Sequence, residues 1–212
     1  FPHLLRLIRE NQFDTIYHEH FSYFSFHTVD RIMSRFGLTI YDVEELPTHG
    51  GSLRIYARHS EDDSKPVESS VAQLLEKEEI SGLLRIETYR AFSERVKALK
   101  RETLSFLISE KNKGKRIAGY GAPAKGNTFL NYCGIRTDFI DYTVDRNPVK
   151  QGRVLPGTRI PVEHPDKIRQ TRPDYVFILP WNLKDEIIAQ LDYIREWGGK
   201  FVVAIPNLQV ME

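Results

Sequence analysis

Near the start of the chain, four consecutive residues, Tyr17-His18-Glu19-His20, have side chains that can bind and transfer a proton. An imidazole has an unperturbed pKa of about 6.5, so it can accept a proton near neutral pH, and a neighbouring carboxylate can orient the ring and stabilise its charged form. In an extended backbone Tyr17 and Glu19 share one face of the chain. In a helical turn Tyr17 and His20 come together instead, and the sequence leaves both geometries open.

The same stretch has two other interpretations. His18 and His20 could bind a metal, but no further ligands follow at a recognisable spacing. The stretch also continues into the aromatic-rich segment 21–25, so both histidines could simply pack among rings. From the residues alone, proton transfer and structural packing both remain possible.

A second stretch, Lys115–Gly126 (KRIAGYGAPAKG), has the pattern of a strand, a glycine turn and the start of a helix. Gly119, Gly121 and Ala124 have the G-x-G-x-x-G/A spacing of a nucleotide-binding turn. Glycine permits positive φ and a close approach of the backbone to a ligand, and the helix start presents unpaired N–H groups to an anion. Lys125 is placed to reach a phosphate. A plain tight turn would use the same glycines, so the spacing alone assigns no ligand.

Strands and helices alternate after Gly114, which predicts a parallel sheet. The expected strands cover residues 116–120, 139–144, 159–162, 175–179 and 201–205, and the expected helices cover residues 122–133, 164–170 and 182–197. Ligands of such sheets bind beyond the carboxyl ends of the strands. We therefore expect four loops, 120–121, 145–147, 180–182 and 206–207, to form one rim.

The rim offers binding groups but no obvious centre for proton transfer. A dinucleotide-binding fold places an acidic residue that binds the ribose roughly 20 residues after the glycine turn, and Asp145 lies near that position after Gly121. Asp145 could equally cap a turn. Trp181 could stack on a base or sugar, or simply pack. Lys150 and Arg153 could help to neutralise a diphosphate.

The part of the chain before the sheet is organised differently. Helical spacing covers residues 3–11, a short strand is expected at 13–16, and a helix capped by Thr28 should end at Gly37. Two alternating runs, Leu38–Glu45 and Ser52–His59, indicate an antiparallel pair. Residues 67–113 have helical composition, with an interruption at residues 81–82.

Composition excludes several classes of function. Lys+Arg total 30 and Asp+Glu 29, so no net field attracts nucleic acid or a membrane surface. The chain lacks an apolar run of the roughly 20 residues that span a bilayer. Its single cysteine, Cys133, excludes an internal disulfide and suits a reducing, cytoplasmic compartment. Because the sequence starts with Phe1-Pro2, we expect it to be cut from a longer protein.

Several blocks together resemble the sugar C-methyltransferase family, whose members methylate a carbon of a nucleotide-linked keto-deoxysugar. The resemblance covers essentially the whole chain. Its blocks are YHEHFSYFS (17–25), THGGSLRIYA (48–57), GYGAPAKGNTFLNYCG (119–134), VDRNPVKQGRVLPGTRIPV (144–162), PDYVFILPWNLKDEI (173–187) and GGKFVVAIPNL (198–208).

The resemblance implies an α/β architecture and a particular division of the chain. Residues 1–62 would be the C-terminal remnant of an S-adenosylmethionine-binding class I methyltransferase domain, including its antiparallel strand pair. Residues 63–113 would be a helical connector, and residues 114–212 a Rossmann-like domain that binds the nucleotide sugar. The S-adenosylmethionine site would lie mostly upstream of Phe1, as would the family's zinc-binding domain, so the isolated chain is expected to be inactive and to hold no metal.

The resemblance also implies roles for individual residues. The family's Y-x-E-H block falls on Tyr17, Glu19 and His20. His20 would remove a proton from the carbon beside the ketone, and Glu19 would orient the His20 ring or stabilise its charged form. Tyr17 would donate a hydrogen bond to the sugar or the enolate oxygen. Seven rim residues would bind the substrate: Gly121, Ala122, Lys125, Gly126, Asp145, Trp181 and Asn182. Whether the chain is a monomer or a homodimer stays open.

Two other functions remain in view. One is an NAD(P)-dependent oxidoreductase that uses the glycine turn, with Asp145 on the ribose; against it, the expected sheet supplies only about half the strands of a full dinucleotide fold. The other is a binding module that holds a nucleotide sugar without catalysis.

Overall fold

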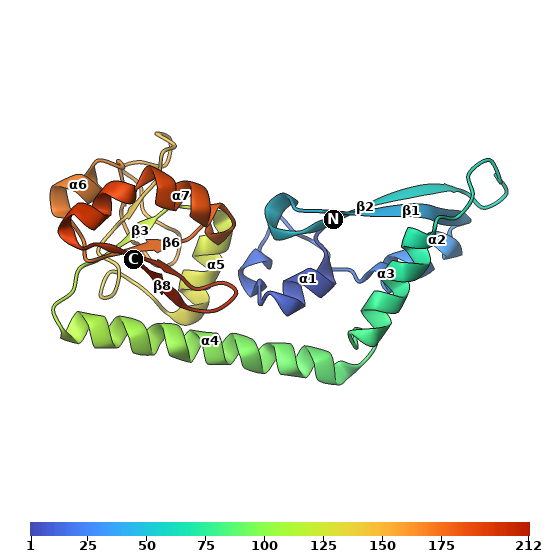
Figure 1. Cartoon of the computed structure of the whole chain (residues 1–212), viewed down its shortest axis with the longest axis horizontal. Coiled ribbons are helices and arrows are strands. Elements are labelled where there is room, and N and C mark those ends of the chain that lie inside the picture. Colours follow the sequence, from blue (N-terminus) through green and yellow to red (C-terminus); the bar gives the residue numbers. More distant parts are fainter. The chain divides into compact units, whose positions relative to one another are not determined.

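The computed structural model describes all 212 residues, which divide into two compact units. The first unit comprises residues 1–12 and 19–95, and the second comprises residues 13–18 and 96–212. The short segment 13–18 therefore belongs to the second unit, although its flanking residues belong to the first. Figure 1 traces the elements along the chain.

The first unit is built on a two-stranded antiparallel sheet. Its elements are α1 (Leu4–Arg9), α2 (Phe26–Arg35), β1 (Leu38–Leu46), the short 3-10 helix η2 (Thr48–Gly50), β2 (Ser52–His59), α3 (Ser69–Ile80) and the beginning of α4 (Ile86–Asn112). The expected strand pair is confirmed, with Leu38 opposite His59 and Leu46 opposite Ser52. Its core joins apolar side chains from both strands and from α2 and α3: Phe26, Val29, Ile40, Val43, Leu53, Val71 and Leu74.

Helix α2 begins differently from the expectation. Ser25, not Thr28, is the N-cap, and its hydroxyl oxygen accepts a hydrogen bond from the Thr28 backbone amide at 3.1 Å. The expected helix ends before Gly37, which has φ of +70°. The buried carboxylate of Glu78 on α3 accepts hydrogen bonds from the amides of Phe26 (2.8 Å) and His27 (3.1 Å), so α3 satisfies donors that the first turn of α2 leaves unpaired.

The second unit is a six-stranded sheet in the order β5-β4-β3-β6-β7-β8. Its strands are β3 (Ile117–Tyr120), β4 (Thr143–Val144), β5 (Val162–Glu163), β6 (Tyr175–Ile178), β7 (Lys200–Val203) and β8 (Gln209–Met211). The first five are mutually parallel and β8 pairs antiparallel with β7. The expected parallel sheet is confirmed, but the expectation of about half a dinucleotide fold is wrong, because this order matches that of a complete doubly wound sheet.

Helices cover both faces of this sheet. On one face, alternate strand residues such as Ala118, Val176 and Phe201 pack with side chains of α6 (Lys167–Thr171) and α7 (Lys184–Gln190). On the other face, Phe177 meets Phe129 of α5 (Ala124–Cys133), with ring centroids 5.9 Å apart.

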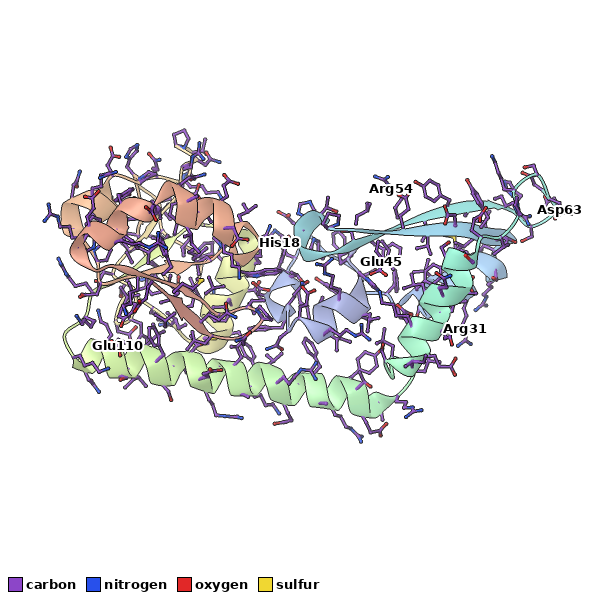
Figure 2. All side chains as sticks on the ribbon, in the orientation of Figure 1. His18, Arg31, Glu45, Arg54, Asp63 and Glu110 are labelled. Carbon is purple, nitrogen blue, oxygen red and sulfur yellow. The ribbon has the colours of Figure 1, made fainter.

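Helix α4 is also joined to the sheet within the second unit. The Tyr175 hydroxyl at the start of β6 donates a hydrogen bond of 2.9 Å to Glu110, which Figure 2 labels near the end of α4. The Phe106 ring packs edge-on against Tyr175 at 5.3 Å between centroids. No helix of the protein has the length and apolar character required to cross a bilayer.

Two local expectations are corrected. Residues 13–16 do not form a strand: Phe13–Thr15 is a single 3-10 turn (η1), because the Phe13 ring packs against Phe129 and Tyr132 of α5. The helix expected over residues 182–197 is broken into η3 (Trp181–Leu183), α7 and η4 (Asp192–Trp197), and it ends at Gly198 in the left-handed conformation.

Candidate functional site

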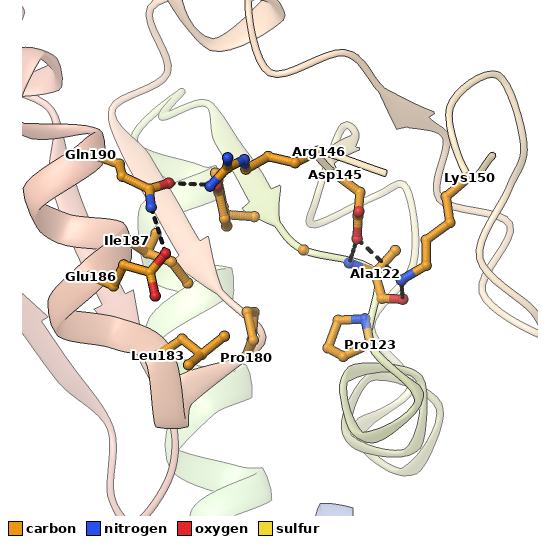
Figure 3. Close-up of a pocket in the computed structure, with 12 residues that line it drawn as sticks. Ala122, Pro123, Asp145, Arg146, Lys150, Pro180, Leu183, Glu186, Ile187 and Gln190 are labelled. Atoms are coloured by element: carbon orange, nitrogen blue, oxygen red, sulfur yellow. Dashed lines mark hydrogen bonds and ion pairs between the residues drawn. The ribbon is translucent and has the colours of Figure 1, made fainter. Parts of the chain in front are cut away.

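A pocket of about 240 Å³ opens in the second unit where the carboxyl ends of β3, β4 and β6 meet (Figure 3). Strands β4 and β6 lie on opposite sides of β3, so this is the topological switch point, where open α/β sheets bind their ligands. Three of the four expected rim loops contribute to its wall, and the Pro206-Asn207 loop does not. The wall consists of Tyr120, Gly121, Ala122, Pro123, Asp145, Arg146, Lys150, Pro180, Leu183, Glu186, Ile187 and Gln190.

The glycines of the turn are required by its geometry. Gly121 has φ of +89°, and a Cβ on it would lie 2.6 Å from Cδ of Pro180. A Cβ on Gly126 would lie 2.9 Å from Cβ of Leu179, so this glycine lets α5 pack closely on the chain after β6. Gly126 does not line the pocket, and its contact with a substrate stays a prediction.

Asp145 closes the glycine turn. Its Oδ2 accepts a hydrogen bond from the Ala122 amide at 2.7 Å and lies 3.3 Å from Lys150 Nζ, while its Oδ1 accepts from the Asn147 amide at 2.8 Å. Lys150 also donates to the Ala122 carbonyl at 2.9 Å. These are turn-capping contacts, one of the two interpretations of Asp145; a contact with a ribose remains a prediction.

The α7 side of the pocket combines the apolar residues Leu183 and Ile187 with the polar residues Glu186 and Gln190. The Tyr120 hydroxyl donates to Gln190 Oε1 at 3.3 Å, and Gln190 Nε2 donates to Glu186 at 2.7 Å. Burial raises the pKa of Tyr120, which keeps its hydroxyl protonated near neutral pH.

A second hollow, of about 380 Å³, borders the first. Tyr120, Arg146 and Gln190 line both hollows. Its further lining includes Arg169, whose guanidinium carbon lies 3.4 Å from the centroid of the Tyr193 ring. The two hollows therefore share a wall that contains a guanidinium group, suited to an anionic ligand.

Three other predicted rim residues form a separate cluster. Lys125 Nζ lies 4.3 Å from the centroid of the Trp181 ring and donates a hydrogen bond to Asn182 Oδ1. None of these side chains lines the switch-point pocket. The structure thus brings Lys125, Trp181 and Asn182 together, and their contact with a substrate remains a prediction.

The sequence did not identify Asp14, which belongs to this cluster. Its side chain is 1% exposed, and its Oδ2 accepts a hydrogen bond of 2.7 Å from Trp181 Nε1. Burial raises the pKa of Asp14 to about 7, although the hydrogen bond from Trp181 and the charge of Lys125 act in the opposite direction. The available signal was an acidic residue in a short segment that begins with Phe13 and ends with Ile16.

The predicted proton-transfer residues lie on a turn. Residues 17–19 form a bend and a turn outside any helix or strand. Tyr17 is half-buried and belongs to the second unit, whereas Glu19 and His20 belong to the first. The roles of all three residues stay predictions. No group of three or more potential metal ligands occurs in the structure.

Comparison with known proteins identifies the family. Residues 47–206 match the family model of the C-methyltransferase C-terminal domain. The chain is also 40% identical to the C-methyltransferase NovU of Streptomyces niveus over 99% of its own length, and it spans 50% of the length of that relative. The expected resemblance is confirmed: this chain belongs to the C-methyltransferase family and contains that family's C-terminal domain.

Proposed function

We propose that this chain is the C-terminal part of an S-adenosylmethionine-dependent methyltransferase that acts on a nucleotide-linked keto-deoxysugar. The methyl group would be added to a carbon next to the ketone. The observation that carries the proposal is the family match over residues 47–206, which includes the whole switch-point pocket.

The pocket supports a nucleotide sugar as the ligand. A diphosphate is a compact dianion, and Arg146 and Lys150 supply cationic groups on one side of the pocket. The Ala122 amide is already bonded to Asp145, so the phosphate would depend on these side chains and not on that amide. In this proposal Arg146, which borders both hollows, holds the diphosphate between them.

The chemistry assigned to the first segment is proton removal. A carbon beside a ketone becomes nucleophilic when its proton is taken, because the resulting charge is delocalised onto oxygen as an enolate. His20 Nδ1 or Nε2 would accept that proton, and the Glu19 carboxylate would stabilise the imidazolium formed. The Tyr17 hydroxyl would donate a hydrogen bond to the enolate oxygen. The proton would then leave His20 for solvent.

The residues of this chain do not fit the methyl donor. The chain has one glycine turn of the nucleotide-binding kind, between β3 and α5 in the second unit. In this turn the Ala122 amide already donates a hydrogen bond to the Asp145 carboxylate. We therefore place the S-adenosylmethionine site mainly outside these 212 residues. That cofactor would supply an electrophilic methyl group.

The test measures removal of the proton beside the ketone, separately from methyl transfer. The protein, expressed at the length encoded by its reading frame, is incubated in D2O with thymidine diphosphate 4-keto-6-deoxyhexose and without methyl donor. We expect deuterium to enter the sugar at a carbon beside the ketone, as seen by proton NMR. His20→Asn should slow this exchange at least 100-fold and leave the Kd for thymidine diphosphate within threefold; unchanged exchange would remove His20 from its role.

The strand order also supports an alternative function, an NAD(P)-dependent oxidoreductase. The order of the sheet is 3-2-1-4-5-6 when its strands are numbered from β3, and dinucleotide-binding domains have the same order. Titration with NADH and, separately, with the thymidine diphosphate sugar distinguishes the two functions. Both tryptophans, Trp181 and Trp197, belong to the second unit, so their fluorescence reports on binding there. Saturable quenching by NADH at micromolar concentration, with none by the sugar nucleotide, would favour an oxidoreductase.

A further inference from the structure

Asp14 is buried in a setting that ordinary packing does not require. Around it lie the apolar side chains of Phe129, Phe177, Leu179 and Ile205. Its Oδ1 is buried and has no hydrogen-bond partner in the structure. A carboxyl group in such surroundings lowers stability unless it is fully paired, and an apolar residue of similar volume would pack at lower cost. The placement therefore calls for a role beyond packing.

The contact that Asp14 does make joins segments far apart in the sequence. Its Oδ2 accepts the indole hydrogen bond of Trp181, which lies 167 residues further along the chain. Trp181 lies three residues beyond the end of β6, and the ammonium group of Lys125, near the start of α5, lies 4.3 Å from the centroid of its ring. One carboxylate thus links η1 to the loops that follow β3 and β6.

The segment held in this way leads into the predicted proton-transfer residues. Phe13 anchors the same turn against α5, with its ring centroid 5.0 Å from that of Tyr132. Tyr17 is three residues beyond Asp14 and lies in the same unit. Displacing η1 would therefore displace Tyr17 relative to the carboxyl edge of the sheet, and small displacements of a positioning group strongly reduce catalysis.

We infer that Asp14 is a positioning residue of the reaction, which fixes the Tyr17 segment to the sugar-nucleotide domain through its hydrogen bond to Trp181. This inference rests on the proposed function. Asp14 itself touches no substrate in this scheme; it acts through Trp181 and the backbone of residues 13–17.

The link should respond to pH. Lys125 is the charged group that faces Asp14, and the other side chains around it are Trp181 and apolar residues. The ionised carboxylate accepts the indole hydrogen bond strongly and attracts Lys125, whereas protonation weakens both interactions. Because burial raises the pKa of Asp14 to about 7, the link should weaken as the pH falls below that value.

The first measurement concerns the link alone. In 1H–15N spectra of the protein at its full encoded length, the indole N–H signal of Trp181, assigned by its loss in Trp181→Phe, should titrate with a midpoint near pH 7. The titration should be absent in Asp14→Asn, and the signal of Trp197, which donates to the Pro173 carbonyl, should not follow it. A Trp181 indole shift at pH 8 that is the same in Asp14→Leu as in the unsubstituted protein would overturn the inference, because it would show that the indole does not donate to Asp14.

The second measurement concerns catalysis. Asp14→Leu, which removes the acceptor of the indole hydrogen bond, and Trp181→Phe should each lower kcat for methyl transfer at least 10-fold while KM for the sugar nucleotide changes less than threefold. The double variant should be no slower than the slower single variant, because both substitutions break the same link. Asp138→Leu, at an exposed position of the second unit, is the matched control and should keep full activity.

The outcomes separate this inference from the function on which it rests. If no sugar nucleotide is methylated or exchanged by the unsubstituted protein, the proposed function fails, and the indole titration still tests the link. If the unsubstituted protein is active and folded Asp14→Leu keeps kcat within twofold, the function stands and the positioning role is overturned. Multiplicative losses in the double variant would also overturn it, because they would show that the two residues act independently.

Discussion

The Asp145 carboxylate lies 2.7 Å from the Ala122 amide and holds the glycine turn against the loop that follows β4. This contact is part of the pocket wall, so the same residue that stabilises the turn also shapes the site. Its consequences for stability and binding can be separated by substitution.

Asp145→Ala should lower the free energy of unfolding of the second unit by about 1–3 kcal/mol, because it leaves the Ala122 amide without its partner. Asp145→Asn keeps an acceptor and should cost less. Urea denaturation followed by the fluorescence of Trp181 and Trp197 measures this unit selectively. Asp138→Ala serves as the control; an equal loss in both alanine variants would show that the turn does not depend on this contact.

Gly121→Ala should be more damaging than Gly134→Ala. Both glycines have positive φ, +89° and +77°, so each alanine costs about 1–2 kcal/mol of backbone strain. At Gly121 the new Cβ would also meet Pro180 at 2.6 Å, whereas nothing lies within 4 Å at Gly134. We expect Gly121→Ala alone to weaken thymidine diphosphate binding, measured by calorimetry, because it distorts the pocket. Equal affinities in the two variants would argue that the ligand lies elsewhere.

Glu78→Ala should destabilise the first unit by about 3 kcal/mol. The side chain is fully buried, and its carboxylate accepts the amides of Phe26 and His27 at the start of α2. Removing it leaves these donors unpaired away from water. Hydrogen exchange of the α2 amides should accelerate, whereas in Glu79→Ala, at an exposed neighbouring position, it should not. Unchanged α2 protection in Glu78→Ala would contradict this account of the helix start.

The stability of the second unit should fall as the pH rises from about 4 to 7, because of Asp14. Burial raises its pKa from 3.8 to about 7 in the folded protein, so the unfolded chain releases this proton at lower pH than the folded chain does. The stabilisation is therefore complete below the unfolded pKa and is lost as the pH passes the folded pKa. Asp14→Asn should remove this dependence.

At pH 8, Asp14→Asn should accordingly be more stable than the unsubstituted protein, by up to about 4 kcal/mol from the shift in pKa alone. Urea titrations at pH 5 and pH 8 give the comparison. If the two proteins differ equally at both pH values, the Asp14 carboxyl does not titrate in this range. A variant that gains stability and loses kcat would show that the carboxyl is retained for function.

Much of the fold could be predicted from the sequence, because local chemistry specifies it. The strand pair of the first unit follows from alternating residues and a glycine-containing loop, and the strand, glycine turn and helix around Gly121 follow from spacing. The helix break at Ser81-Gly82 was also evident. Strand β8 was not expected: it is three residues long, lies at the sheet edge, and has no clear alternation of apolar residues.

Contacts between distant residues were decided only by the tertiary structure. Thr28 and Ser25 are both good capping residues, and the backbone path at the start of α2 selects Ser25. Phe13–Thr15 has a composition suited to a strand, yet packing of Phe13 on α5 imposes a turn. Spacing along the chain likewise carries no information about a hydrogen bond that spans 167 residues. The sequence by itself determined the family and the elements around the glycine turn, because both depend on residue type and local order. Only the folded chain decided that Lys125 and Trp181 face Asp14 and not the switch-point pocket, because side-chain partners depend on how the elements pack.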